Sequence, residues 1–335
     1  MAREIRRYHS LAEFLRASFG TRVQKVTLDA GFTCPNRDGT RGKGGCIYCN
    51  ALGSGTGAAR QGLSIRAQML AGMERLARRY KARKFIAYFQ AFSNTYAPVE
   101  VLRQRYQEAL VDERVVGLSV GTRPDCVDEE VVKLLAEFKE KGLMVWLEMG
   151  LQSAHNRTLA LINRGHTFED FLRALTLAKK YDLLVCTHVI FGLPGERPED
   201  MLETINQISR LPLDGIKFHE LYVVRGTPME RLYREGRYQP LTQTEYVDLV
   251  CEALALLPWR VVIQRLTGDP RPEELVAPAW AREKQLTLRM IEETLINRDL
   301  WQGKYLGEPD PYLKEAPASS RRAISPPQWH VNSRK

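Results

Sequence analysis

Short apolar segments rich in β-branched and aromatic residues recur along most of the chain, and longer segments with apolar residues at three- and four-residue spacing separate them. The first pattern is typical of buried strands and the second of amphipathic helices. The pattern predicts six strands, at residues 23–28, 85–90, 116–121, 144–150, 184–191 and 216–223. It predicts five helices between them, at 64–79, 99–111, 128–141, 168–181 and 199–211. This alternation favours an α/β fold with a parallel, barrel-like sheet.

The alternation weakens after residue 224, where two helices are predicted at 245–257 and 281–297 with a strand at 261–266 between them. We therefore expect four parts, namely an N-terminal segment 1–20, a core barrel 21–225, a C-terminal α/β extension 226–313 and a tail 314–335. The tail holds scattered basic residues without apolar periodicity. It is expected to be disordered, or to become ordered only on a partner.

Length and composition narrow the class of protein. The chain has 335 residues, of which 44% are hydrophobic and 27% charged, values typical of globular proteins. No run approaches 18 consecutive apolar residues and the first residues lack the apolar stretch of a secretory signal, so we expect a soluble, cytoplasmic protein without a membrane partner. Six cysteines in such a protein favour metal binding or catalysis over disulfides.

The formal net charge of +9 favours an anionic partner such as nucleic acid. Five basic residues and one acidic residue in the tail account for four of these charges, so the folded part is only mildly basic. Positive charge is still concentrated locally in two places. One is the run from Arg75 to Lys84, where six of ten residues are basic, and the other contains Arg37, Arg41 and Lys43. A solvated helix face explains the first run equally well.

Cys34, Cys46 and Cys49 lie within sixteen residues, directly after the first predicted strand. The spacing of Cys46 and Cys49 suits zinc, an iron–sulfur cluster or a redox disulfide. A thioredoxin-like motif needs no third thiol, and a closed zinc site would need a fourth ligand that no nearby Cys or His supplies. Three thiolates leave one coordination position open, as a catalytic centre requires. A [4Fe-4S] cluster held in this way would offer one iron to a substrate or cofactor.

Other cysteines and glycines near this loop have simpler interpretations. Cys126, Cys186 and Cys251 are isolated and are expected to be core residues. The glycine-rich stretch at 53–58 matches a dinucleotide-binding pattern, but it follows the cysteine loop and not a strand. We interpret it as a flap over the cysteines.

The three-cysteine loop after the first strand resembles that of the radical S-adenosylmethionine (radical SAM) superfamily. The long gap after Cys34, with Ile47 and Tyr48 inside the cysteine pair, is similar to the Elp3-related branch, and residues 1–310 resemble the bacterial YhcC/YtqA family throughout. The resemblance implies a partial (β/α)6 TIM-like barrel with a [4Fe-4S] cluster on Cys34, Cys46 and Cys49. It also implies reductive cleavage of S-adenosyl-L-methionine (SAM) to a 5′-deoxyadenosyl radical, with a one-electron donor such as flavodoxin or ferredoxin.

The same resemblance implies which residues meet SAM. The second strand lacks the usual Gly-Gly-Glu motif and runs into Gln90 and Ala91, which leaves the amino-group contact to backbone carbonyls there. Residues 122–125 are similar to the Thr-Arg-Pro-Asp element of Elp3-like proteins. The expected cofactor-binding residues are Gln90, Ala91, Gln152, Arg164 and His188. The motifs that contain them follow predicted strands, and catalytic groups of α/β barrels gather at the carboxyl ends of strands.

Several further residues of the barrel mouth have two interpretations each. Glu148 lies within a strand and is expected to be either functional or paired with Arg123 or Arg164, because carboxylates are seldom buried unpaired. His219 and Glu220 face either the substrate or the core. His155 and His166 are expected at the surface or at helix starts. Aromatic residues that could stack a flipped base, or else belong to the core, are Tyr96, Tyr222 and Trp280.

The family resemblance also implies a substrate. It points to tRNA, with 5-carboxymethylaminomethyluridine at the wobble position converted to 5-aminomethyluridine. One alternative is a radical SAM enzyme acting on a porphyrin-like small molecule, which would share the core motifs. Another is a non-catalytic, metal-bearing RNA-binding protein, which would need a fourth zinc ligand.

Overall fold

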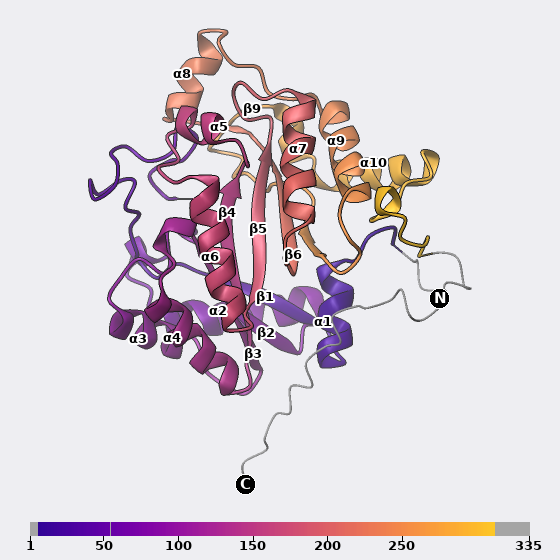
Figure 1. Cartoon of the computed structure of the whole chain (residues 1–335). Helices are drawn as coiled ribbons and strands as arrows, with labels where there is room; N and C mark the ends of the chain where they lie inside the picture. Colours follow the sequence, from indigo (N-terminus) through magenta and orange to yellow (C-terminus); the bar gives the residue numbers. More distant parts are fainter. Residues whose placement is uncertain (1–5, 54, 312–335) are drawn as a thin grey trace.

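A computed structural model describes residues 6–53 and 55–311. Its centre is a curled sheet of seven strands in the order β1-β2-β3-β4-β5-β6-β8, in which all neighbours are parallel (Figure 1). The strands are β1 Val23–Leu28, β2 Lys84–Phe89, β3 Val115–Thr122, β4 Met144–Gln152, β5 Leu184–Phe191, β6 Gly215–Glu220 and β8 Val262–Arg265. The predicted α/β fold with a partial TIM-like barrel is confirmed.

Helices on the outer face connect the first six strands. They are α2 Ile65–Tyr80, α3 Val99–Glu108, α4 Glu129–Glu140, α6 Phe168–Lys180 and α7 Pro198–Ser209. Each predicted helix is found to within a few residues. In α6, the buried side chains at 171, 174, 175 and 178 follow the helical spacing, which turns one apolar face toward the sheet. Figure 1 shows α6 and α7 in front of the strands β4 to β6 and running alongside them.

A helix that the hydrophobic pattern did not predict, α1 Leu11–Phe19, closes the amino-terminal end of the barrel. Its start is capped by Ser10, whose side chain accepts a hydrogen bond from the backbone N–H of Glu13. Phe14 packs edge-on against Trp146 of β4, with ring centroids 5.8 Å apart. Together with Val262 they belong to a buried apolar cluster that fills this end of the barrel.

The chain after residue 225 both completes the sheet and covers its mouth. It contains α8 Pro228–Arg234, α9 Gln243–Ala255, β8, β9 Leu275–Ala277 and α10 Lys284–Asn297. β9 pairs antiparallel with β7 Val223–Val224, while β8 becomes the seventh strand. The remaining short elements are α5 Asn156–Leu161 and the 3-10 helices η1 Ala59–Gln61, η2 Pro124–Cys126, η3 Ala279–Arg282 and η4 Lys304–Leu306.

The remaining expectations concern the tail and the membrane. The tail 314–335, predicted to be disordered, lies outside the described residues. Among the helices of the described part, none is both long and apolar enough to cross a membrane.

Candidate active site

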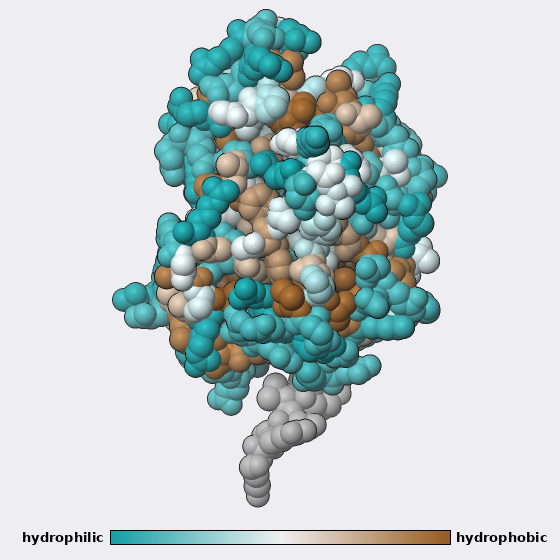
Figure 2. All heavy atoms as spheres, turned by 90° about the vertical axis from the view of Figure 1, so that its left-hand side faces the viewer, coloured by the Kyte–Doolittle hydropathy of each residue, from teal (hydrophilic) through white to brown (hydrophobic). Residues whose placement is uncertain are grey.

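A cavity of about 490 Å³ lies at the carboxyl ends of the barrel strands. Its lining includes all three cysteines of the loop, together with residues that follow or end β2, β3, β4, β5, β6 and β8. The loop that carries the cysteines projects at the left of Figure 1, on the side that Figure 2 turns toward the viewer. Hydrophilic residues cover most of that face, and neutral and hydrophobic ones show between them. The structure thus brings the predicted cluster ligands to the end of the barrel where catalysis is expected.

Backbone and guanidinium contacts hold the cysteine loop in place. Arg37 donates from Nη2 to the carbonyl oxygens of Cys49 and Asn50, at 2.6 and 2.7 Å. The backbone N–H of Ile47 donates to the carbonyl of Ile162, and that of Met229 donates to the carbonyl of Ile47. The loop is therefore fixed both to the barrel and to the C-terminal extension.

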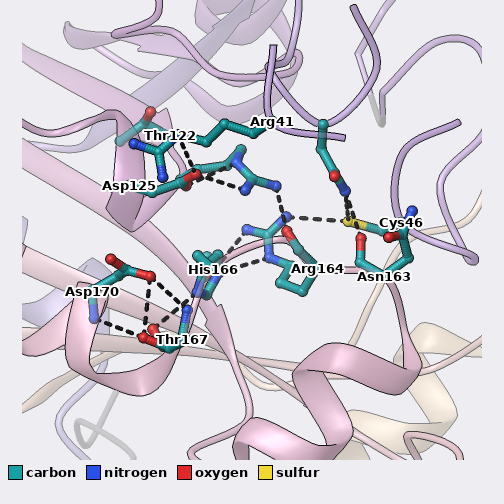
Figure 3. Close-up of polar contacts among 12 residues, drawn as sticks. Arg41, Cys46, Thr122, Asp125, Asn163, Arg164, His166, Thr167 and Asp170 are labelled. Carbon is teal, nitrogen blue, oxygen red and sulfur yellow. Dashed lines mark hydrogen bonds and ion pairs between the residues drawn. The ribbon is translucent and has the colours of Figure 1, made fainter. Parts of the chain in front are cut away.

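Two side-chain hydrogen-bond donors are directed at the sulfur of Cys46. Asn36 Nδ2 and Arg164 Nη1 lie 3.8 and 3.4 Å from its Sγ, where both can donate to a thiolate (Figure 3). Burial would raise the pKa of Cys46, but the charges of Arg164 and Arg123 outweigh it and lower that pKa. Burial and the neighbouring Cys46 raise the pKa of Cys49. Donors directed at a buried sulfur suit a thiolate ligand.

The spacing of the thiols distinguishes a cluster from a single ion. Among the described residues, the one group of three or more His, Cys, Asp or Glu ligand atoms within 4.8 Å of one another is Glu148, Cys186 and His188. The three loop sulfurs do not form such a group, so at least one pair is farther apart. Sulfurs bound at ~2.3 Å to one zinc ion cannot lie more than about 4.6 Å apart. The loop therefore fits an iron–sulfur cluster better than a single zinc ion.

Arg164 is placed against the cysteine loop. Besides Cys46, its guanidinium donates to the carbonyl of Gly150 at 2.7 Å and to Nε2 of His166 at 2.9 Å. Arg123, ion-paired with Asp125 at 2.9 Å, donates to the backbone carbonyl of Arg164 at 2.6 Å. Figure 3 shows Arg164 between Cys46 and His166. Its expected contact with SAM stays a prediction.

His166 directly precedes Thr167, the N-cap of α6, so it lies beside a helix start as one of the two expectations had it, but it does not lie at the surface. Its ring is buried and accepts the hydrogen bond from Arg164. Burial and the charges of Arg164 and Arg123 lower the pKa of His166 to about 3. The short loop from α5 to α6 contacts Gly150 near the carboxyl end of β4, which the local sequence did not indicate. His155 does lie at a helix start, directly before α5.

Gln152 combines a strained backbone with an unpartnered side-chain oxygen. Its φ is +78°, and the pairing of β4 with β5 shifts register between Gly150 and Gln152. Its Oε1 is buried without a hydrogen-bond partner in the described structure and lines the cavity. Such strain in a non-glycine residue is typical of functional sites. A donor from a bound cofactor would satisfy this oxygen.

The other expected SAM contacts differ in position. Gln90 and His188 line the cavity. Ala91 is fully buried, and its side chain lies against Gly55, where a Cβ would come within 2.5 Å. Ala91 is not among the lining residues, in contrast to Gln90 and His188. These roles also stay predictions.

The predicted pairing of Glu148 with Arg123 or Arg164 is wrong. Glu148 is fully buried and accepts from Lys25 Nζ at 2.5 Å, from Lys217 Nζ and from Ser119. His188 Nε2 lies 2.9 Å from the same carboxylate. Arg164 instead donates to Cys46, and Arg123 pairs with Asp125 and donates to the backbone carbonyl of Arg164. The inward face of β4 brings Glu148 onto the barrel axis, where lysines of β1 and β6 meet it.

Strong mutual charge effects mark this buried network. The two lysines hold the pKa of Glu148 well below its usual range although burial opposes this. Burial lowers the pKa of Lys25 to about 8, and burial with the charge of Lys217 lowers that of His188 to about 4. Two lysines on Glu148 leave no room for a metal cation there. Sequence reasoning missed Lys25 and Lys217, although a lysine inside an apolar strand segment was an available signal.

The cavity wall opposite the expected SAM contacts comes from β6, β8 and the segment after β8. His219, Glu220 and Tyr222 line it, in agreement with the substrate-facing interpretation. The base-stacking possibility fails for Trp280, which is hydrogen-bonded to the Leu241 carbonyl and packs on Tyr246. Tyr96 donates to Thr40 and is not among the lining residues.

The C-terminal extension closes one side of the cavity. Arg271 donates to the carbonyl of Gly55 at 2.6 Å, and Asn50 donates to the carboxylate of Glu274 at 2.9 Å. Gly53, Gly55 and Thr56 line the cavity, while Ser54 lies outside the described residues. The glycine-rich stretch thus lies at the cavity, where the flap was expected.

The three isolated cysteines differ in burial. Cys186 and Cys251 are fully buried core residues, as predicted, whereas Cys126 is half-buried in η2. Burial raises the pKa of Cys126 to about 12.

Comparison with known families decides the class of the protein. A model of the radical SAM superfamily matches residues 36–208, and a model of the radical SAM C-terminal domain matches residues 213–297. The chain belongs to the radical SAM superfamily. The match begins two residues after Cys34, so the role of Cys34 rests on its place beside Cys46 and Cys49 at the cavity. The family implies a [4Fe-4S] cluster and SAM.

Relatives place this radical SAM protein near two groups. It is 43% identical to YtqA of Bacillus subtilis over 90% of this chain and 93% of the relative. It is 33% identical to a tRNA uridine(34) acetyltransferase of Dehalococcoides mccartyi, over 47% of this chain and 34% of that protein. The name of the first assigns no activity, and the second match covers only part of each chain.

A solved structure supports the fold. An Elp3 of Methanocaldococcus infernus with a deleted N-terminus superposes with a TM-score of 0.66 and 20% identity, over 84% of this chain and 64% of that one. At this identity, the likeness shows the shared architecture and not a shared substrate.

Proposed function

We propose that this radical SAM enzyme acts on tRNA in the cytoplasm and converts 5-carboxymethylaminomethyluridine at the wobble position to 5-aminomethyluridine. The conversion is an oxidative N-dealkylation: SAM takes up two electrons and yields methionine and 5′-deoxyadenosine, water supplies oxygen, and the carboxymethyl group leaves as glyoxylate. The observation that carries the proposal is the cavity itself, which joins three cysteines at one wall to a polar wall of β6 and β8 at the other. The partial match to a tRNA uridine(34) acetyltransferase supports a modified uridine as substrate.

Residues on the cysteine side would hold the cofactors. Cys34, Cys46 and Cys49 would bind the [4Fe-4S] cluster, and Gln90, Gln152 and His188 offer polar atoms to SAM. When bound, this pair supplies a 5′-deoxyadenosyl radical that takes a hydrogen atom from the substrate. Arg164 and Asn36 orient Cys46 by donating to its sulfur. A one-electron donor such as flavodoxin or ferredoxin would serve as the reductant.

Residues at the mouth would receive the RNA. Arg75 of α2 is exposed and lines the cavity, so the basic run from Arg75 to Lys84 begins at its edge. Tyr222 lines the opposite wall and offers an aromatic face to a base turned out of the anticodon loop. Arg271 and Glu274 tie the extension to the cysteine loop and help to exclude water.

Nucleoside mass spectrometry of tRNA from a deletion strain tests the proposal. We expect 5-carboxymethylaminomethyluridine to accumulate and 5-aminomethyluridine to disappear. Expression of the wild-type protein should restore the product, as should Cys251→Ala, which removes a thiol far from the cavity. The triple variant Cys34→Ala/Cys46→Ala/Cys49→Ala should not restore it.

A second experiment tests the same proposal with the purified enzyme. Anaerobically reconstituted protein with SAM and a reductant should form 5-aminomethyluridine in tRNA from the deletion strain. Unchanged wobble uridine both in the cell and with the purified enzyme would contradict the proposed substrate. An undiminished cluster in the triple variant would contradict the assigned ligands.

A further inference from the structure

Arg265 at the end of β8 is an unsatisfied cation inside the cavity. It is half-buried and lines the cavity wall. No hydrogen bond or ion pair joins its guanidinium to any residue in the described ranges 6–53 and 55–311. A guanidinium offers five N–H donors in a planar fork, and withdrawing it from water without a partner is costly. A ligand with paired oxygen acceptors would remove that cost.

A second donor lies on the neighbouring strand. His219 of β6 lines the same wall, and its ring centroid is 5.7 Å from that of His188. Its ring makes no hydrogen bond within the part of the chain that the structure describes. Burial and the charge of Arg265 hold the pKa of His219 well below its usual range. His219 is therefore neutral near pH 7 and offers one N–H donor.

The charges around this wall do not balance. Three cations, Lys25, Lys217 and Arg265, face two carboxylates, Glu148 and Glu220, within or beside the barrel interior. The other charged residues of this side of the cavity pair among themselves or outside it, Arg271 with Glu274 and Asp269 with Lys284. Glu148 is already satisfied by both lysines. One negatively charged group on a ligand would neutralise the excess next to Arg265.

Glu220 supplies the complementary acceptor. Its Oε2 accepts from Thr267 at 3.0 Å and from the backbone N–H of Gly268 at 2.6 Å. Its Oε1 is buried without a hydrogen-bond partner in the described structure, and Glu220 does not pair with Arg265. Burial raises the pKa of Glu220, and a bound cation would lower it again. The wall thus presents an unpartnered guanidinium and an unpartnered carboxylate oxygen from adjacent parts of the sheet.

We propose that Arg265 and His219 bind the carboxylate, and Glu220 the neighbouring secondary ammonium, of an N-substituted glycine group on the substrate. The proposal rests on the proposed function and assigns the residues that recognise its modified side chain. An RNA phosphodiester offers oxygens to Arg265 but no N–H to Glu220. The zwitterionic group therefore accounts for both unpartnered atoms, and a phosphate for only one.

Equilibrium dialysis of the reconstituted holoenzyme with free nucleosides tests this assignment. The probes are 5-carboxymethylaminomethyluridine and its methyl ester, which lacks the negative charge. Both are used at about pH 6, where the amine of each is protonated. We expect the wild type to bind the acid about tenfold or more tightly than the ester. A difference of this size corresponds to the contribution of one hydrogen bond to a charged group. Arg265→Gln should abolish this preference by weakening only the acid. Glu220→Gln should weaken the acid and the ester alike.

Matched controls separate recognition from general damage. Arg289→Gln removes one exposed positive charge on α10 and should bind both nucleosides as the wild type does. Circular dichroism spectra and SAM binding of the Arg265 and Glu220 variants should match the wild type. An Arg265→Gln enzyme that still prefers the acid would overturn the proposal.

Two other outcomes would also overturn it, in distinguishable ways. If inorganic phosphate displaces the acid from the wild type as readily as free acid does, the wall is a phosphate site. If the wild type leaves wobble uridines of tRNA unchanged, the proposed function fails, and this assignment fails with it. If the wild type converts tRNA but the Arg265→Gln variant still prefers the acid, the proposed function stands and only this assignment fails.

Discussion

Arg164 donates a hydrogen bond from Nη1 to the Sγ of Cys46 across 3.4 Å. The guanidinium is anchored by Gly150 and His166, and the backbone carbonyl of the same residue accepts from Arg123. A fixed positive charge therefore meets one predicted cluster ligand from the barrel side. Hydrogen bonds to ligating sulfurs raise cluster reduction potentials, and partners of metal ligands support metal retention.

Substitution of Arg164 tests this role. Arg164→Met should lower the reduction potential of the bound cluster and weaken cluster retention about 10- to 100-fold. The measurements are a redox titration followed by electron paramagnetic resonance, and iron per protein after a chelator challenge. Arg157→Met is the control, because Arg157 pairs with Asp200 away from the cysteines. Equal potentials and iron contents in the two variants would show that the Arg164 contact has no effect on the cluster.

Glu148 should be essential to the stability of the barrel interior. Glu148→Gln removes the carboxylate but leaves Lys25 and Lys217 buried, so it should cost about 3–5 kcal/mol of unfolding free energy. Adding Lys217→Met removes one of the unpaired charges and should recover part of this loss. Urea denaturation of the three proteins at pH 7 measures both effects. A single variant that loses under ~1 kcal/mol would contradict the network.

His166 should make the protein sensitive to mild acid. Its folded-state pKa is about 3, below the value of about 6.5 for an unfolded chain. As the pH falls from about 6.5 toward 3, the unfolded chain binds a proton that the folded protein excludes. The contribution of His166 to the free energy of unfolding is therefore complete above this pH window. It is lost as the pH falls through the window, by at most ~1.4 kcal/mol per pH unit.

Unfolding free energies between pH 7 and pH 5 measure this effect. His166→Gln should show a shallower loss than the wild type, even if it is less stable at pH 7. The expected difference in loss is about 1–2 kcal/mol over this range. Parallel pH profiles for the two proteins would rule out the buried, neutral His166.

Gly165 and Gly20 form a matched pair for a test of crowding next to Cys46. Both have positive φ, +70° and +68°, so alanine is strained at either position. A Cβ on Gly165 would lie 2.8 Å from Asn36 Oδ1, whereas a Cβ on Gly20 meets nothing within 4 Å. Gly20→Ala should cost about 1 kcal/mol. Gly165→Ala should cost more and also lower iron retention, because it displaces Asn36 from Cys46.

Thermal unfolding and iron analysis of both alanine variants check this prediction. Iron retention that is equally high in Gly165→Ala and Gly20→Ala would mean that Asn36 does not support the cluster.

The sequence by itself determined the order of strands and helices and the loop that carries the cluster ligands. Strand and helix periods are local, and the apolar runs at 23–28 and 184–191 were predicted with the bounds that β1 and β5 have. The spacing of Cys34, Cys46 and Cys49 is local as well. The strand 216–223 was predicted too long, because the chain leaves the sheet at Glu220 and begins β7 at Val223. α1 was missed although its capping residue Ser10 was visible.

Only the tertiary structure decided which polar side chains meet inside the barrel. One interpretation paired Glu148 with Arg123 or Arg164, but Glu148 instead meets Lys25 and Lys217, which lie over a hundred and nearly seventy residues away in the chain. Strand order and curvature bring these positions to one axis, and neither is encoded in a local pattern. The same holds for Arg265, because β8 reaches the sheet edge only after α8 and α9. Cofactor chemistry was thus readable from local spacing, whereas the charges that select a substrate depend on long-range packing.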